Sequence, residues 1–144
     1  MNNNKGKYSA YNPDHGPEPY IFNISKTSAQ NRNYRTTVWT GKDLQQTLMC
    51  ICDEVGLEIH PDNDQFIRIE EGCGRAMMGK TKNNLNYKCD VSKGCVIFVP
   101  AGTWHNFVNC GRSPLKLSSI YAPPHHPHGT VHRTKEDADR EEKY

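Results

Sequence analysis

The sequence predicts an all-β domain, either a sandwich or a barrel, and three observations lead to this prediction. Short runs of β-favouring residues recur between residues 20 and 122, and clusters of Gly, Pro, Asn and Asp separate them. The only helix candidate in this region is a short segment, Thr40–Gln46. Parallel strands need long crossover connections, usually helices, so the scarcity of helices excludes a parallel α/β fold. Many short strands with frequent turns are typical of sandwiches and barrels.

The predicted strands follow one another in short pieces, and turn residues separate most of them. The strands are Tyr20–Ile24, Thr36–Trp39, Leu48–Cys52, Leu57–Ile59, Gln65–Ile69, Arg75–Met78, Val96–Val99, Asn106–Asn109 and Leu115–Tyr121. The turns are Pro61–Asp64, Glu71–Gly74, Lys82–Asn84, Ser92–Gly94, Pro100–Gly102 and Asn109–Gly111. We therefore expect three parts: an extended arm over residues 1–19, a barrel over 20–122, and a Pro/His-rich segment with a charged tail over 123–144.

Length and composition exclude several classes of protein. A chain of 144 residues matches one domain on the usual prior of roughly 100–200 residues. The 18 Lys and Arg against 16 Asp and Glu leave a net charge of +2, with no basic stripe, so we expect no nucleic-acid partner. The longest apolar run, Cys95–Val99, is far shorter than the ~20 residues that span a bilayer, so we expect no membrane partner.

The N-terminus indicates a cytoplasmic location, which in turn sets the expected state of the cysteines. The first seven residues lack the apolar stretch of a signal peptide. The six cysteines are then expected to be reduced thiols. No Cys-x-x-Cys pair is present, which argues against a thiolate zinc site.

Two stretches carry residues suited to chemistry. In Gly56–Gly72, Glu58 and His60 are two apart on a β-like segment and therefore face the same side, and Gln65 opens the next strand. In Gly94–Asn109, a strand ends at Pro100–Gly102 and His105 leads the return strand. These residues alone indicate two neighbouring inward polar groups and one remote histidine.

The second stretch resembles the second sequence motif of the cupin family, the small jelly-roll β-barrels. It matches at every fixed position of that motif, which are Gly94, Pro100, Gly102, His105 and Asn109.

The first stretch has the spacing of the first cupin motif, with two changes. Glu58 stands where the family has its first histidine, and Gln65 stands where it has glutamate, whereas His60 and Gly72 are as expected. Since both motifs occur in the right order, with 21 residues between them, the chain is identified as a member of the cupin superfamily. The fold class that the resemblance implies is an all-β cupin jelly-roll barrel with an extended N-terminal arm and a polar C-terminal tail.

The resemblance implies one divalent metal ion inside the barrel, held by Glu58, His60, Gln65 and His105. Imidazole, carboxylate and amide oxygen suit Zn, Fe, Ni, Mn or Co. Glu58 is alternatively a general base beside the metal, and Gln65 a weak fourth ligand or a hydrogen-bond partner of bound water. A further alternative is a metal-free site in which the two histidines and Glu58 hold one another by hydrogen bonds. Tyr121 either points into the pocket as a catalytic group or packs in the core.

For the function we expect a metalloenzyme of the isomerase or lyase type that acts on a sugar, a sugar acid or a keto/enediol compound. The alternatives are a non-haem iron or manganese dioxygenase and a small-ligand-binding cupin without turnover. His125, His126 and His128 lie in a Pro-rich segment that we expect to run along the barrel and to bind nickel only adventitiously. We also expect a homodimer, in which the Tyr20–Ile24 strand joins a neighbouring barrel.

Overall fold

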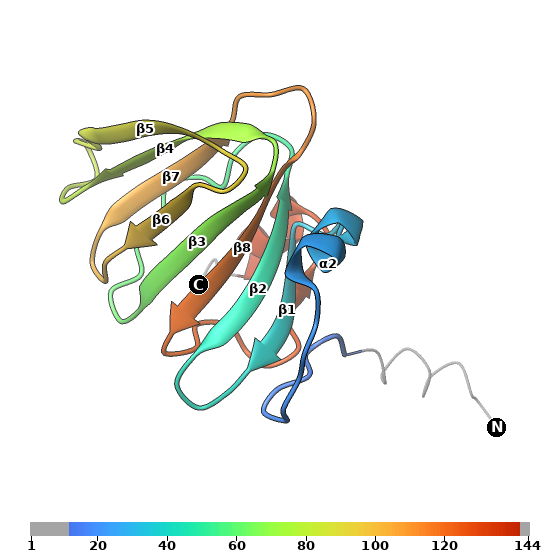
Figure 1. Cartoon of the computed structure of the whole chain (residues 1–144). Helices are drawn as coiled ribbons and strands as arrows, with labels where there is room; N and C mark the ends of the chain where they lie inside the picture. The colour runs from blue at the N-terminus through green and yellow to red at the C-terminus, as the bar shows by residue number, and fades with distance from the viewer. Residues whose placement is uncertain (1–11, 142–144) are drawn as a thin grey trace.

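Two antiparallel β-sheets form the body of the protein in a computed structural model that describes residues 12–141 (Figure 1). The strands are β1 (Arg35–Thr40), β2 (Gln45–Ile51), β3 (Asp64–Glu71), β4 (Cys73–Gly79), β5 (Tyr87–Ser92), β6 (Val96–Val99), β7 (Trp104–Asn109), β8 (Leu115–Ala122) and β9 (Val131–His132). The helices are α2 (Ile24–Gln30) and α3 (Lys135–Glu141). One sheet has the strand order β6-β3-β8-β2-β1-β9 and the other β5-β4-β7. The predicted all-β jelly-roll fold is confirmed.

The hydrophobic core lies between the two sheets, where the pleat of each strand directs alternate side chains inward. In β3, Ile67 and Ile69 are buried, whereas Phe66 and Arg68, which alternate with them along the strand, are only partly buried. In β8, Leu115 and Leu117 are buried in the same way. The three-stranded sheet contributes Ala76, Met78, Val91 and Phe107 to the same cluster.

One end of the barrel interior is polar. Gln45 at the start of β2 pairs with Tyr121 at the end of β8, and Tyr121 also pairs with Gln65 at the start of β3. The next inward pair along the same strands is Thr47 with Ser119. All five side chains are buried, so polar groups gather inside the barrel at the end where β2 and β3 begin.

The predicted strand Tyr20–Ile24 is wrong. Residues 20–23 have no regular structure, and Ile24 begins helix α2. The Asn23 side chain accepts a hydrogen bond from the backbone N–H of Lys26, at 2.9 Å, and so caps this helix. Ile21 is 97% exposed, so this segment does not bury the apolar side chains that suggested a strand. The homodimer stays a prediction, but the strand on which it rested is absent.

The predicted helix Thr40–Gln46 is also wrong. Thr40 ends β1, Gln45 begins β2, and the two residues pair across a tight hairpin. The hairpin is closed by a hydrogen bond from the N–H of Gly41 to the carbonyl of Leu44, at 2.9 Å. The pairing with β1 on one side and β8 on the other outweighs the weak helical preference of this short segment.

The described part of the N-terminal arm packs against β1. The N–H of His15 donates to the carbonyl of Val38, at 2.8 Å, and the indole of Trp39 donates to the carbonyl of Glu18, at 2.6 Å. Residues 1–11 of the predicted arm lie outside the described residues. At the other end of the chain, β9 pairs with β1, and α3 buries Ala138 in the core cluster. Within residues 12–141, no helix is long and apolar enough to cross a membrane.

Asp14 ties the arm to the barrel and to the Pro/His-rich segment. Its carboxylate accepts hydrogen bonds from the N–H of Gly16, the hydroxyl of Thr40 and the N–H of Gly129. The His128 ring lies 3.4 Å from the same carboxylate. Burial alone would raise the pKa of Asp14, but these hydrogen bonds and His128 outweigh it, so the pKa lies below its ordinary value of 3.8.

We expect Asp14→Asn to lower the free energy of unfolding at neutral pH by about 1–3 kcal/mol, because an amide nitrogen would face the donors of Thr40 or Gly129. The lowered pKa means that the Asp14 carboxylate stabilises the fold above pH 3.8 and that this stability is lost as the pH falls through the pKa of the folded state. Urea unfolding at pH 7 and at low pH measures both effects. The control is Asp43→Asn in the exposed hairpin. Equal losses for both variants at pH 7 would contradict the expectation.

Candidate metal centre

Glu58 and His105 lie opposite each other across a single β-bridge. The N–H of Glu58 donates to the carbonyl of His105 and the N–H of His105 donates to the carbonyl of Glu58, each at 2.9 Å. Residues that exchange both bonds in this way are direct neighbours in an antiparallel ladder, and their side chains lie on one face. The predicted strand Leu57–Ile59 is present only as this bridge. His60, two residues after Glu58, joins the same cluster.

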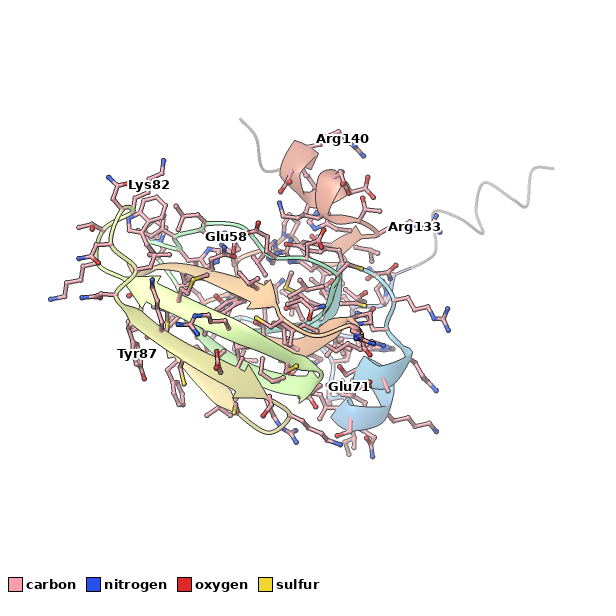
Figure 2. The ribbon with its side chains drawn as sticks, turned by 90° about the horizontal axis from the view of Figure 1, so that it is seen from above. Glu58, Glu71, Lys82, Tyr87, Arg133 and Arg140 are labelled. Carbon is pink, nitrogen blue, oxygen red and sulfur yellow. The ribbon has the colours of Figure 1, made fainter. Side chains whose placement is uncertain are left out.

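The side chains of Glu58, His60 and His105 converge on one point. Their role as metal ligands stays a prediction. Each offers one ligand-type atom, and these three atoms lie within 4.8 Å of one another. Glu58 Oε1 is 3.5 Å from His60 Nε2 and 3.7 Å from His105 Nε2. His105 is fully buried and His60 nearly so. Figure 2 shows Glu58 on the α3 side of the three-stranded sheet, whereas Tyr87 projects from the edge strand β5.

These separations fit a metal ion better than direct hydrogen bonds. A side-chain contact of 3.5–3.7 Å is too long for a good N–H···O hydrogen bond. Two tetrahedral ligands that each lie about 2.1 Å from zinc are about 3.4 Å apart. The two Glu58 distances are close to that value, so the spacing of Glu58 from both histidines is compatible with ligands that share one metal ion.

The protonation of His105 is set by its backbone partner. Its Nδ1 lies 2.9 Å from the carbonyl oxygen of Thr103, which can only accept, so Nδ1 carries the proton. In the neutral ring, Nε2 then presents a lone pair to the cluster. A hydrogen bond to the second ring nitrogen is the usual way in which a ligating histidine is oriented. Within residues 12–141, His105 Nε2 and both ring nitrogens of His60 are buried without a hydrogen-bond partner.

Glu58 is ionised in this setting. Burial alone would raise the pKa of Glu58, but contacts with His105 and His60 and the positive charge of Arg35 outweigh it and hold this pKa well below its usual range. The cluster therefore offers one carboxylate and two imidazoles, a donor set that suits Zn, Fe, Ni, Mn or Co.

Gln65, near the start of β3, pairs with Tyr121 of β8, whose ring centroid lies 5.6 Å from that of His60. The Nε2 of Gln65 donates to the hydroxyl of Ser119, at 2.9 Å, and its Oε1 is buried without a hydrogen-bond partner among the described residues. This bond to Ser119 orients the amide and leaves the oxygen, the ligand-type atom, available. Ligation by Gln65 stays a prediction.

A pocket of about 530 Å³ lies in front of Glu58 and His60. Its lining residues are Leu57, Glu58, Ile59, His60, Trp104, His125, His126, Pro127, His132 and Glu141. A larger hollow of about 610 Å³ lies against β4, β5 and β6, but none of the three clustered residues lines it. The pocket that can bring a molecule to the cluster is therefore the one walled by the Pro/His-rich segment.

Tyr121 is the remaining predicted site residue, and it lies next to the cluster inside the barrel. It is 1% exposed, and its ring centroid is 5.6 Å from that of His60 and 5.3 Å from that of His125. Sequence reasoning did not assign His125, His126 and His132 to the pocket. The unusual density of histidines after β8 was the only signal, because nothing in their spacing shows which way this segment folds.

Comparisons with known proteins identify the family. The family model described as "Cupin domain" matches residues 52–121. The uncharacterized protein YrkC of Bacillus subtilis (strain 168) is 56% identical over 127 residues, which cover 87% of this chain and 68% of YrkC. The chain belongs to the cupin family.

Solved structures agree with this assignment. The crystal structure of BH2720 from Bacillus halodurans superposes with a TM-score of 0.88 at 52% identity and covers 89% of this chain and 98% of that one. KdgF from Halomonas sp. superposes with a TM-score of 0.55 at 18% identity, covering 63% of this chain and 80% of KdgF, which shows similarity of fold alone.

We expect the purified protein to retain about one equivalent of a divalent metal, and the double variant His60→Ala/His105→Ala to retain none, because it removes two of the three converging ligands. Elemental analysis by mass spectrometry on untagged protein measures the content. His15→Ala, which removes an exposed histidine on the arm, is the matched control. Equal metal content in the double variant and the wild type would place the metal elsewhere.

The role of Gln65 is tested by two substitutions at that position. If its Oε1 ligates, we expect Gln65→Leu to weaken metal binding about tenfold and Gln65→Glu to strengthen it, since a carboxylate is a stronger ligand for a divalent ion. Competition against a chromophoric chelator measures both affinities. An unchanged affinity in Gln65→Leu would mean that Gln65 does not ligate.

Proposed function

We propose that this protein is a metal-dependent enzyme acting on a small, oxygen-rich molecule, namely a sugar, a sugar acid or a keto/enediol compound, by isomerase or lyase chemistry. The observation that carries the proposal is the convergence of Glu58, His60 and His105 within 4.8 Å, beside a pocket of about 530 Å³ that Glu58 and His60 line. A buried metal site that opens on a cavity of this size suits a small ligand.

In this proposal some residues of the chain would bind the ion and others form the pocket. Glu58, His60 and His105 would hold the metal, and the Thr103 carbonyl keeps His105 in the ligating tautomer. A bound divalent ion supplies Lewis-acid polarisation of a carbonyl or hydroxyl oxygen. If Glu58 ligates through Oε1, its second oxygen stays available to accept a proton from the substrate, which would join the two roles that the sequence left open.

A second candidate function is a non-haem iron or manganese dioxygenase. One specific observation favours it: two histidines and one carboxylate are the donor set of the facial triad that leaves open positions for substrate and oxygen. A small-ligand-binding protein without turnover has the same geometry and is the third outcome of the experiment below.

The test compares the zinc-loaded and iron-loaded proteins against aldoses, ketoses and uronic acids in D₂O, with proton NMR and an oxygen electrode as the two readouts. We expect deuterium to enter the substrate carbon next to the carbonyl, with zinc bound and without oxygen uptake. Oxygen uptake with iron that zinc abolishes would instead establish the dioxygenase. Thermal stabilisation by a compound that stays chemically unchanged would establish a binding protein.

Glu58→Gln separates the two roles of the carboxylate within the same experiment. Because the amide is a weaker ligand, we expect this variant to bind metal at least tenfold more weakly. Full metal content with lost deuterium exchange would show that Glu58 is a base and not a ligand.

A further inference from the structure

The Pro/His-rich segment between β8 and β9 is fixed in place as one wall of the pocket. Gln45, which is fully buried, accepts hydrogen bonds from the N–H groups of His125 and His126, at 3.1 and 2.9 Å. The same amide donates to the carbonyl of His126, at 2.7 Å. Further along, the hydroxyl and the N–H of Thr37 both donate to the carbonyl of Thr130. The backbone of this segment is therefore held by the barrel, and the imidazoles stay available for the pocket.

The imidazoles of this segment continue the metal cluster across the pocket. The ring centroid of His125 is 4.4 Å from that of His60, and the ring of His126 follows at 4.6 Å from His125. His132 lies 6.3 Å beyond His126. His125, His126 and His132 all line the pocket that Glu58 and His60 line from the other side.

The ring of His126 is neutral, and among the described residues its Nε2 has no hydrogen-bond partner. Burial, followed in size by the positive charge of Arg35, lowers the pKa of His126 to about 2. His126 is 8% exposed, and its Nε2 is buried. A neutral imidazole donates one hydrogen bond, so this wall offers a donor to whatever occupies the pocket.

The buried charges around the pocket favour an anion. Arg35 is 2% exposed, and its Nη1 lies 3.0 Å from Nδ1 of His132, one of the histidines that line the pocket. Its positive charge acts on both Glu58 and His126. A bound divalent ion would add to the positive charge of Arg35, and the carboxylates that line the pocket are Glu58 and Glu141. Glu141, which pairs with His132 at 3.0 Å, is 57% exposed and therefore screened by solvent.

We propose that the pocket takes a small hydroxy- or keto-carboxylate, which lies between the Glu58–His60 edge of the metal centre and the wall formed by His125 and His126. The carboxylate receives its hydrogen bond from His126 on the side where Arg35 contributes its charge. This inference rests on the proposed function, since it needs the metal centre, and it narrows the substrate class to acids.

Glycerate and glycerol are the probes, because they share a three-carbon skeleton and differ in one carboxylate. Titration calorimetry on the zinc-loaded, full-length protein measures both affinities. We expect glycerate to bind at least tenfold more tightly than glycerol. Because chelation of zinc alone would also favour glycerate, the wall is tested by His126→Leu, for which we expect at least a fivefold loss of glycerate affinity with unchanged zinc affinity.

Two further variants make the result decisive. His125→Leu alters an exposed wall residue, keeps the protein testable if His126→Leu does not fold, and is expected to weaken glycerate binding as well. His128→Leu is the matched control, because its ring contacts the carbonyl of Gly16 on the arm and not the pocket. We expect glycerate affinity to be unchanged in His128→Leu.

The outcomes separate this inference from the proposed function. Equal affinities for glycerate and glycerol, or full glycerate affinity in both wall variants, would overturn the carboxylate assignment and leave the metal centre intact. Failure of the wild-type protein to bind zinc, measured in the same samples, would overturn the proposed function and the substrate class together.

Discussion

Glu58 and His105 exchange two backbone hydrogen bonds, and this short bridge joins the loop before β3 to the start of β7. The site depends on it, because the bridge decides on which face the two side chains lie. A register shift of one residue would turn Glu58 and His60 away from His105 and disperse the donor set. The turn at Pro100–Gly102 supports the same register, since the N–H of Gly102 donates to the carbonyl of His60, at 3.0 Å.

The two ends of the barrel interior differ in polarity: one is apolar, and the other holds the polar groups of the site. Apolar side chains such as Ile51, Ile69 and Leu115 are fully or almost fully buried away from the site and supply the hydrophobic contribution to folding. At the other end, imidazole nitrogens and an amide oxygen are buried without hydrogen-bond partners among the described residues. Burying such groups costs free energy, so a bound cation would stabilise the folded chain as well as equip it for catalysis.

The sequence predicted the ligand cluster better than the pocket around it. Spacing alone placed Glu58 and His60 on one face, and it was the resemblance to the two cupin motifs that joined His105 to them. The position of His126 in the pocket could not be predicted, since it depends on a hydrogen bond to Gln45, 81 residues away. Strand β5 was missed because most of Tyr87–Ser92 is exposed and shows no apolar alternation. Tyr20–Ile24 was misassigned because a helix cap at Asn23 outweighed a short β-favouring run.

The pocket wall is assembled from contacts that are distant along the chain, and this has a kinetic consequence. Gly129 reaches Asp14 across 115 residues, and Thr130 reaches Thr37 across 93. Contacts of such long range form slowly, because the conformational entropy of closing a long loop is lost before the contacts contribute favourable free energy. During synthesis the barrel strands emerge first, and the wall is completed only after residues 125–130 have left the ribosome. The cluster of Glu58, His60 and His105 can therefore form before the segment with His125 and His126 is in place.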